Sequence, residues 1–109
     1  MSTIKSFTDL NAWKEGHELV LSIYSSTKTF PAEEKFGLVD QMRRCSVSIT
    51  SNIAEGFSRR SNKEKTQFFY IALGSTAELQ SQLLVARDIN YLTSEHFRDI
   101  AEKQLLLIS

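Results

Sequence analysis

The sequence predicts an all-α protein, an antiparallel up-down four-helix bundle. Apolar residues recur every three or four positions over long stretches, and the 109 residues include only four Gly and one Pro. No stretch alternates apolar and polar residues between turn residues, as a half-buried strand would. Helices are expected at roughly 9–29, 32–56, 62–90 and 94–108. Because the connections between them are short, neighbouring helices should run antiparallel in one domain spanning residues 1–109.

The first helix should begin near Thr8 or Asp9, both good N-caps, and end before Pro31. Its core stripe is predicted to be formed by Leu10, Trp13, His17, Val20, Leu21 and Tyr24. Three apolar residues of this helix are expected to lie away from the core: Ala12, Leu19 and Ile23.

The second helix should open at Pro31, whose fixed φ suits a first turn, with Glu33 and Glu34 near its positive end. Gly56 is a natural stop. Its core stripe is predicted to be formed by Leu38, Met42, Cys45, Ile49 and Ile53.

The third helix is the longest, and the stretch from Ser61 to Glu64 has the capping-box pattern that opens a helix. Its core stripe is predicted to be formed by Phe68, Ala72, Leu79, Leu83 and Ala86. The fourth helix, capped by Thr93 or Ser94, looks short beside the third and ends without a C-cap. Either the chain is truncated there or its tail packs on a neighbour.

Composition narrows the class of protein. The 13 basic and 13 acidic residues give a net charge of zero, whereas proteins that coat nucleic acid usually carry excess positive charge. The only cysteine, Cys45, cannot form a disulfide within the chain, which fits a reducing compartment. The N-terminus lacks the pattern of a signal peptide, and no stretch approaches the roughly 20 apolar residues of a membrane span. The sequence therefore predicts a soluble cytoplasmic protein.

No residue pattern predicts a catalytic, cofactor or metal site. Cys45 and His17 fall on predicted core stripes, and His96 falls in the first turn of the last helix. Neither histidine follows a glutamate by three residues, as di-metal bundles require, and one cysteine is too few for Cys-rich zinc sites. The chain is not expected to be an enzyme.

A polar stripe runs beside the core of the second helix, with a similar pair on the third. Its members are Gln41, Arg44, Ser48, Asn52, Glu55 and Arg59, together with Glu78 and Gln82. The stripe lines either a polar pocket or a hydrogen-bond network in which Glu55 pairs with Arg59 at i,i+4. The network is favoured, because buried polar groups must find partners. A structural role is therefore predicted for Gln41, Arg44, Ser48, Asn52, Glu55 and Glu78.

Two further surfaces are candidates for binding. The turn between the second and third helices gathers Arg59, Arg60, Lys63 and Lys65, which are candidate contacts to nucleic-acid phosphates. Arg43 and Arg44 lie inside a helix and are expected to pair with carboxylates. Some helices also carry apolar residues on a second face, away from the predicted core stripe, and these predict an oligomer interface. The alternative is that they are scattered surface hydrophobes. The candidate interface residues are Val39, Val47, Tyr70, Leu73, Ala77 and Leu84.

Four segments occur in order and at matching distances: "FTDLNAWKEGHELVLSIY", "FGLVDQMRRCSVSITSNIAEGFSRRSNKE", "FFYIALGSTAELQSQL" and "ARDINYL". Together they resemble the four-helix-bundle family of bacterial 23S rRNA intervening-sequence proteins, also called S23 proteins. The resemblance covers nearly the whole chain. It implies a cytoplasmic bundle that assembles into a ring-like homopentamer, and a biochemical role that is largely unassigned. A related accessory variability protein of diversity-generating retroelements is a basic pentamer that associates with RNA and reverse transcriptase.

The chain departs from this family pattern at three positions. Leu73 stands where the family often has Arg, Cys45 where it often has Ala, and Asn90 where Gly is usual. The loss of a basic residue at position 73, with zero net charge, argues against nucleic-acid binding. The favoured function is a non-enzymatic homo-oligomeric scaffold, and the alternative is weak, sequence-independent binding of RNA or DNA through a basic rim. Neither a membrane nor a small-molecule substrate is expected as a partner.

Overall fold

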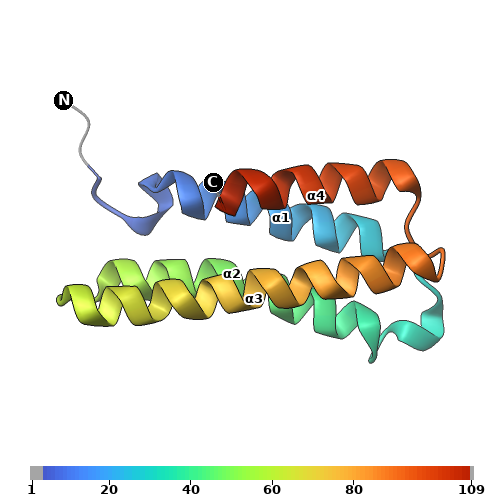
Figure 1. The fold of residues 1–109 in the computed structure, drawn as a ribbon, viewed down its shortest axis with the longest axis horizontal. Coiled ribbons are helices and arrows are strands. Elements are labelled where there is room, and N and C mark those ends of the chain that lie inside the picture. The colour runs from blue at the N-terminus through green and yellow to red at the C-terminus, as the bar shows by residue number, and fades with distance from the viewer. Residues whose placement is uncertain (1–3, 109) are drawn as a thin grey trace.

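The computed structural model describes residues 4–108, which form four α-helices and two 3₁₀ helices and contain no strand (Figure 1). The elements are η1 (Phe7–Asp9), α1 (Asn11–Thr27), η2 (Ala32–Glu34), α2 (Leu38–Ser58), α3 (Asn62–Asp88) and α4 (Ser94–Ile108). Consecutive helices run in opposite directions, so that α1 packs against α2 and α4, and α3 packs against α2 and α4. The predicted all-α architecture of four helices is confirmed.

α1 begins later than predicted, because a 3₁₀ turn precedes it. Ser6 caps this turn by accepting a hydrogen bond from the Thr8 amide (3.2 Å). The Asp9 carboxylate accepts in return from the backbone amides of Lys5 (2.9 Å) and Ser6 (3.1 Å). The capping chemistry expected at Thr8 or Asp9 is therefore used by η1, and α1 starts at Asn11.

α2 begins at Leu38 and not near residue 32. Pro31 opens only the short η2, after which the chain turns at Gly37, the residue that precedes α2. The Glu34 carboxylate accepts a hydrogen bond from the Leu38 amide (3.3 Å), so a side chain from η2 satisfies one of the free donors at the helix start. At the other end, α2 continues through Gly56 to Ser58.

α3 begins as predicted, with the Ser61 hydroxyl accepting from the Glu64 amide (3.1 Å). It ends at Asp88 because Asn90 adopts a left-handed conformation with φ of 65°. The Tyr91 amide then donates to the Ala86 carbonyl (2.8 Å), which closes the helix end. Asparagine is among the few residues other than glycine that tolerate this conformation.

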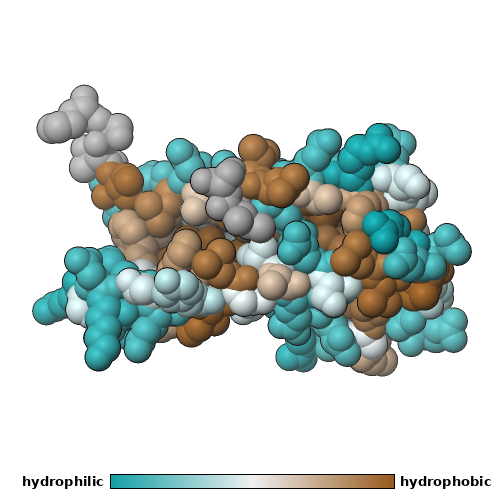
Figure 2. Space-filling model, viewed as in Figure 1, coloured by the Kyte–Doolittle hydropathy of each residue, from teal (hydrophilic) through white to brown (hydrophobic). Residues whose placement is uncertain are grey.

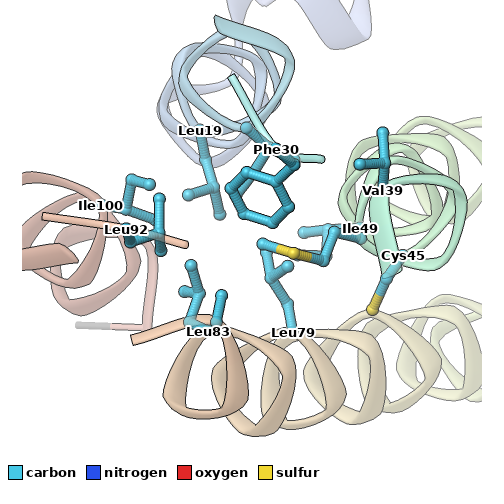
Figure 3. Close-up of a cluster of buried hydrophobic side chains, with 12 residues drawn as sticks. Leu19, Phe30, Val39, Cys45, Ile49, Leu79, Leu83, Leu92 and Ile100 are labelled. Carbon is cyan, nitrogen blue, oxygen red and sulfur yellow. The ribbon is translucent and has the colours of Figure 1, made fainter. Parts of the chain in front are cut away.

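The core lies between the four helices, where side chains from all of them point toward one another (Figure 3). The predicted core residues of α2 and α3 that are buried are Met42, Cys45, Ile49, Ala72, Leu79, Leu83 and Ala86. Leu38 and Ile53 are partly buried and pack against this cluster. The predicted stripes of α2 and α3 are confirmed except for Phe68, which is half-buried and lies outside this cluster.

The predicted orientation of α1 is wrong. Leu19 and Ile23, expected to face away from the core, are fully buried at 0% exposure. Leu21 and Tyr24, expected inside, are 50% and 39% exposed, and His17 is exposed as well. α1 carries two apolar stripes, and the structure buries the one that contains Gly16.

Gly16 explains the choice of stripe. A Cβ atom placed on it would lie 2.9 Å from the Thr50 side-chain methyl carbon, so α1 contacts α2 through bare backbone at this point. The other stripe is left on the outside, where the Trp13 and His17 rings stack with centroids 4.8 Å apart. His17 is therefore a surface residue and not a core histidine.

Val39 also needs correction. It was expected on a second face of α2 as part of an oligomer interface, but it is 7% exposed and belongs to the core cluster of the single chain. α2 starts at Leu38, and the chain before it folds over this first turn, so Val39 has no free surface to offer.

Gly16→Ala should destabilise the protein. Alanine favours a helix over glycine by about 1 kcal/mol, but overpacking a tight contact costs about 1–3 kcal/mol. The Thr50 hydroxyl donates to the Val47 carbonyl (3.0 Å), which restricts rotation of the methyl group away from the clash. We expect a net loss of about 1 kcal/mol in the free energy of unfolding, measured by urea denaturation.

Two control variants distinguish the steric contact from other effects. Thr50→Ser removes the methyl carbon that lies 2.9 Å from the added Cβ, so it should restore most of the lost stability in the double variant. A Cβ on Gly74 would meet no atom within 4 Å, so Gly74→Ala should instead raise stability by about 1 kcal/mol. A Gly16→Ala variant as stable as the wild type would contradict the proposed role of this contact.

Candidate functional site

The inner part of the polar stripe forms a small hydrogen-bond network between α2 and α3. The Ser48 and Ser75 hydroxyls lie 2.9 Å apart, which joins the two helices directly. The Asn52 amide donates to the Ser48 carbonyl (2.7 Å) and to the Ser48 hydroxyl (3.1 Å). All three residues are half-buried, and the network joins α2 to α3 beside the core.

The outer part of the stripe is exposed and makes local ion pairs. Arg44 pairs with Asp40 (3.0 Å), and Arg59 pairs with Glu55 (3.1 Å), both at i,i+4. Such exposed pairs contribute only about 0.3–0.5 kcal/mol each. Gln41 and Glu78 are also exposed. The structure therefore brings Ser48 and Asn52 together with Ser75 and leaves the other predicted members of the stripe outside this network.

Contrary to expectation, Arg43 pairs with no carboxylate within residues 4–108. Its guanidinium donates to the Thr27 hydroxyl (3.0 Å) and the Tyr24 carbonyl (3.3 Å). It also lies over the Tyr24 ring, 4.6 Å from the centroid. Arg43 thus binds the C-terminal end of α1 to α2, where a positive charge complements the helix dipole.

Two of the four basic residues predicted to contact nucleic acid are engaged within the chain. The Lys65 ammonium donates to the backbone carbonyls of Phe57 (3.1 Å) and Gly56 (3.4 Å), at the end of α2. Arg59, already paired with a carboxylate, lies over the Phe68 ring at 4.9 Å. Lys65 therefore acts first as a C-terminal cap of α2, a role that sequence spacing did not indicate.

Arg60 and Lys63 remain available at the same turn. Both are exposed, and neither forms an ion pair within residues 4–108. Figure 2 shows hydrophilic residues gathered over the α2–α3 turn at the left end of the molecule. The free positive charge of this turn thus rests mainly on two side chains and not on four.

An open apolar groove of about 290 Å³ lies between α1, α2, the first half of α3 and the end of α4. Its lining consists of Ala12, Ile49, Asn52, Ile53, Gly56, Phe57, Lys65, Phe69, Ala72, Leu73, Thr76 and Leu107. α4 reaches the middle of α3, where Gln104 donates to the Thr76 carbonyl (3.1 Å), and the groove lies beside the first half of α3. Figure 2 shows hydrophobic residues exposed between α1 and this uncovered half of α3. The short predicted fourth helix was the one sequence feature that indicated this groove.

The residues predicted for an oligomer interface divide into two places. Tyr70, Leu84 and Val47 are 65%, 42% and 38% exposed, and Ala77 is exposed too. Leu73 instead lines the apolar groove, where it is half-buried. Single-sequence reasoning missed Phe69 and Phe36, which are 57% and 87% exposed, because no helical stripe pointed to them.

Cys45 lies in the core and not in a reactive site. Its thiol donates to the Ser75 carbonyl (3.0 Å). Burial is the main cause that raises the pKa of the Cys45 thiol to about 11, and the nearby Glu78 carboxylate is the second. A nucleophilic cysteine needs a lowered pKa.

Across residues 4–108, no three His, Cys, Asp or Glu side chains cluster as metal ligands would. The described helices also include none that is both long enough and apolar enough to cross a membrane.

Comparisons with known proteins agree on the fold. A family model described as "23S rRNA-intervening sequence protein" matches residues 8–107. A solved structure from Bacteroides thetaiotaomicron, described as a protein with unknown function from the S23 ribosomal protein family, superposes with a TM-score of 0.80 at 21% identity. The alignment covers 88% of this chain and 90% of that one. No curated protein matches.

Asn52→Ala should lower stability by about 1 kcal/mol, because it removes the two side-chain hydrogen bonds that Asn52 donates to half-buried Ser48. Glu55→Ala removes only an exposed ion pair and should change the free energy of unfolding by less than about 0.5 kcal/mol. Thermal or urea unfolding measures both. Equal effects from the two variants would contradict the division of the stripe into a buried network and exposed pairs.

Cys45 should react slowly with iodoacetamide at pH 8 in the folded protein and quickly in urea, because the raised pKa keeps the thiol protonated. The folded state holds this proton more tightly than the unfolded state. Stability contributed by the group is therefore present below pH 9 and is lost as the pH rises toward about 11. Cys45→Ala should remove this component of the pH dependence. Fast labelling of the folded protein at pH 8 would contradict the assignment.

Proposed function

Because the chain belongs to the family of 23S rRNA-intervening sequence proteins, we propose that it acts as a non-enzymatic scaffold that assembles with further copies of itself. The assembly is a closed ring, and the family resemblance implies five copies. The lone reduced cysteine favours a cytoplasmic location.

One observation carries this proposal: the single chain leaves much apolar surface open to water. Along α3, Tyr70, Ala77 and Leu84 are exposed at seven-residue spacing, so they lie on one face of the helix. Large exposed apolar patches on soluble proteins usually mark surfaces that a partner covers, and these three residues share one exposed face. A second copy of the chain is the partner that is always present at the same concentration.

Binding of RNA through the α2–α3 turn is the second candidate function. Arg60 and Lys63 support it, because they are exposed and have no carboxylate partner in the described part of the chain. In a ring, the turn would recur in every subunit and form a basic rim. Phosphate contacts of this type position a nucleic acid without reading its sequence. The zero net charge and the engagement of Lys65 limit the strength of such binding.

Light scattering at micromolar concentration should give a mass that is a multiple of 12.4 kDa, with five copies expected. Leu84→Asp or Tyr70→Asp should lower the mass of the particle. Helicity measured by circular dichroism should stay unchanged, because both side chains are exposed in the single chain. Ser25→Asp, at an exposed polar position on α1, which does not contact α3, serves as a control that should leave the mass unchanged. A wild-type mass of 12.4 kDa would overturn the scaffold proposal.

RNA binding, measured by fluorescence anisotropy with a labelled single-stranded RNA, should be weak and should fall steeply with salt. Arg60→Ala/Lys63→Ala should weaken it and reduce the salt slope by about 1–2, since each lost phosphate contact removes roughly 0.7–0.9. Arg98→Ala, an exposed basic residue on α4, is the matched control. Salt-independent binding, or binding unaffected by the double change, would exclude this turn as the site.

A further inference from the structure

α3 carries a stripe of exposed residues that runs from one end of the helix to the other. From Lys63 to Asp88, exposed positions recur at alternating spacings of four and three residues, which is the spacing of a coiled-coil seam. At about 100° per residue, these positions lie opposite the buried Leu79 and Leu83. Within residues 4–108, α3 packs only against α2 and α4. Between its two charged ends, this outer stripe consists of Gln67, Tyr70, Gly74, Ala77, Ser81 and Leu84.

Large apolar side chains are exposed on the outer stripe and beside it. Tyr70 and Leu84 on the stripe are 65% and 42% exposed. Ile71 and Val85, each one residue further along the helix, are 51% and 48% exposed and form one flank of the stripe. Removing these side chains from water is favourable, so the stripe is suited to a contact with another helix.

Gly74 has no steric reason to be glycine within the described chain. A Cβ atom placed on it would meet no atom within 4 Å, whereas one placed on Gly16 would meet α2. Glycine is nevertheless a poorer helix former than alanine. With Ala77 and Ser81 as neighbours on the stripe, Gly74 leaves the middle of the outer surface low. A second helix can therefore approach closely at this point, because the side chains at a contact set the distance between helix axes.

The outer stripe is complementary to itself when two copies of α3 lie antiparallel. Its spacings read the same in both directions, so each stripe position of one copy faces a stripe position of the other. In the register that matches the two ends, Tyr70 faces Ser81 of the second copy, and Gly74 faces Ala77. Large residues thus face small or polar ones, as knobs face holes in a coiled coil.

The charged ends of the stripe match in the same register. Lys63 faces Asp88 of the second copy, and the symmetry repeats this pair at the other end. Lys63 forms no ion pair within residues 4–108. Arg87 donates to the Oδ1 atom of Asp88 (2.8 Å), and Oδ2 accepts no hydrogen bond from the described residues. Because Arg87 also lies over the Phe97 ring (4.9 Å), it is held toward α4 and away from the stripe.

The other charged residues near the stripe do not oppose this pairing. Glu64 and Glu78 lie on one flank of the stripe and Arg87 on the other, so no like charges lie directly opposite each other in the antiparallel pair. Arg60, in the turn before α3, adds positive charge at the end that faces Asp88 of the second copy. Opposite charges at both ends therefore favour the antiparallel orientation over the parallel one.

From this self-complementarity we infer that two copies pair through their outer stripes, with α3 of one copy antiparallel to α3 of the other. The same surface is used on both copies, so the contact has two-fold symmetry. The inference rests on the proposed self-assembly and specifies one of its contacts. It is independent of the number of copies in a ring, since this contact alone gives a dimer and between two rings it joins them.

The test uses two full-length charge-reversed variants, Lys63→Asp and Asp88→Lys. Each places like charges opposite each other at both ends of its own pair. Both changes suit the dipole of α3, so each variant should keep its helicity by circular dichroism. Light scattering over a dilution series at low salt should show a dissociation constant for pairing raised roughly tenfold, because two exposed ion pairs become repulsive. Where the pairing is lost, the particle has half the wild-type mass.

An equimolar mixture of the two variants provides the decisive measurement. In a mixed pair, opposite charges face each other at both ends, so the mixture should regain the wild-type mass and affinity. At roughly 1 M salt, where the Debye length is about 3 Å, the differences among the proteins should shrink. Lys14→Asp, at an exposed position on α1, which does not contact α3, is the matched charge-reversal control and should pair as the wild type does.

Two results would overturn the antiparallel pairing while leaving self-assembly through another surface intact. One is single variants that pair as tightly as the wild type at low salt. The other is a mixture that pairs no more tightly than either variant alone. A wild type that stays at 12.4 kDa would overturn both the pairing and the proposed self-assembly.

Discussion

The close contact between α1 and α2 at Gly16 is the constraint on which the rest of the bundle depends. Because Gly16 has no side chain, the Thr50 methyl group packs directly against the α1 backbone. This contact turns Leu19 and Ile23 into the core. The second apolar stripe of α1 is thereby placed outside, where Trp13 and His17 stack on each other. One small residue thus decides both the interior and one outer face.

In residues 4–108, the bundle is open beside the part of α3 that α4 does not reach. α3 has 27 residues and α4 has 15, so at about 1.5 Å per residue roughly 18 Å of α3 lacks α4 as a neighbour. Residues that a longer fourth helix would cover, such as Phe69 and Leu73, line a groove instead. If the chain self-assembles as proposed, the hydrophobic effect would favour covering this surface with another copy.

Charged groups contribute more to holding the helices together than to presenting a binding surface. Arg43 connects α2 to the end of α1 through Thr27 and Tyr24, and Lys65 binds the last carbonyls of α2. Arg59 is shared between a carboxylate and an aromatic ring. Because Lys65 and Arg59 already have partners, the free cations at the α2–α3 turn are mainly Arg60 and Lys63.

The sequence by itself determined the number and type of the helices and the inward stripes of α2 and α3, because each has a dominant apolar face at helical spacing. It also indicated the Ser61 cap, the Glu55–Arg59 pair and the short α4. Only the tertiary structure decided which of two apolar stripes on α1 is buried, since periodicity cannot rank two similar faces. The tertiary structure also decided the roles of Val39 and Lys65. Val39 is buried by the chain that folds over the start of α2, and Lys65 donates to the carbonyls at the end of α2. The groove and the exposed Phe36 arise from where helices end relative to one another, a spatial relation between distant segments that spacing along a single chain does not encode.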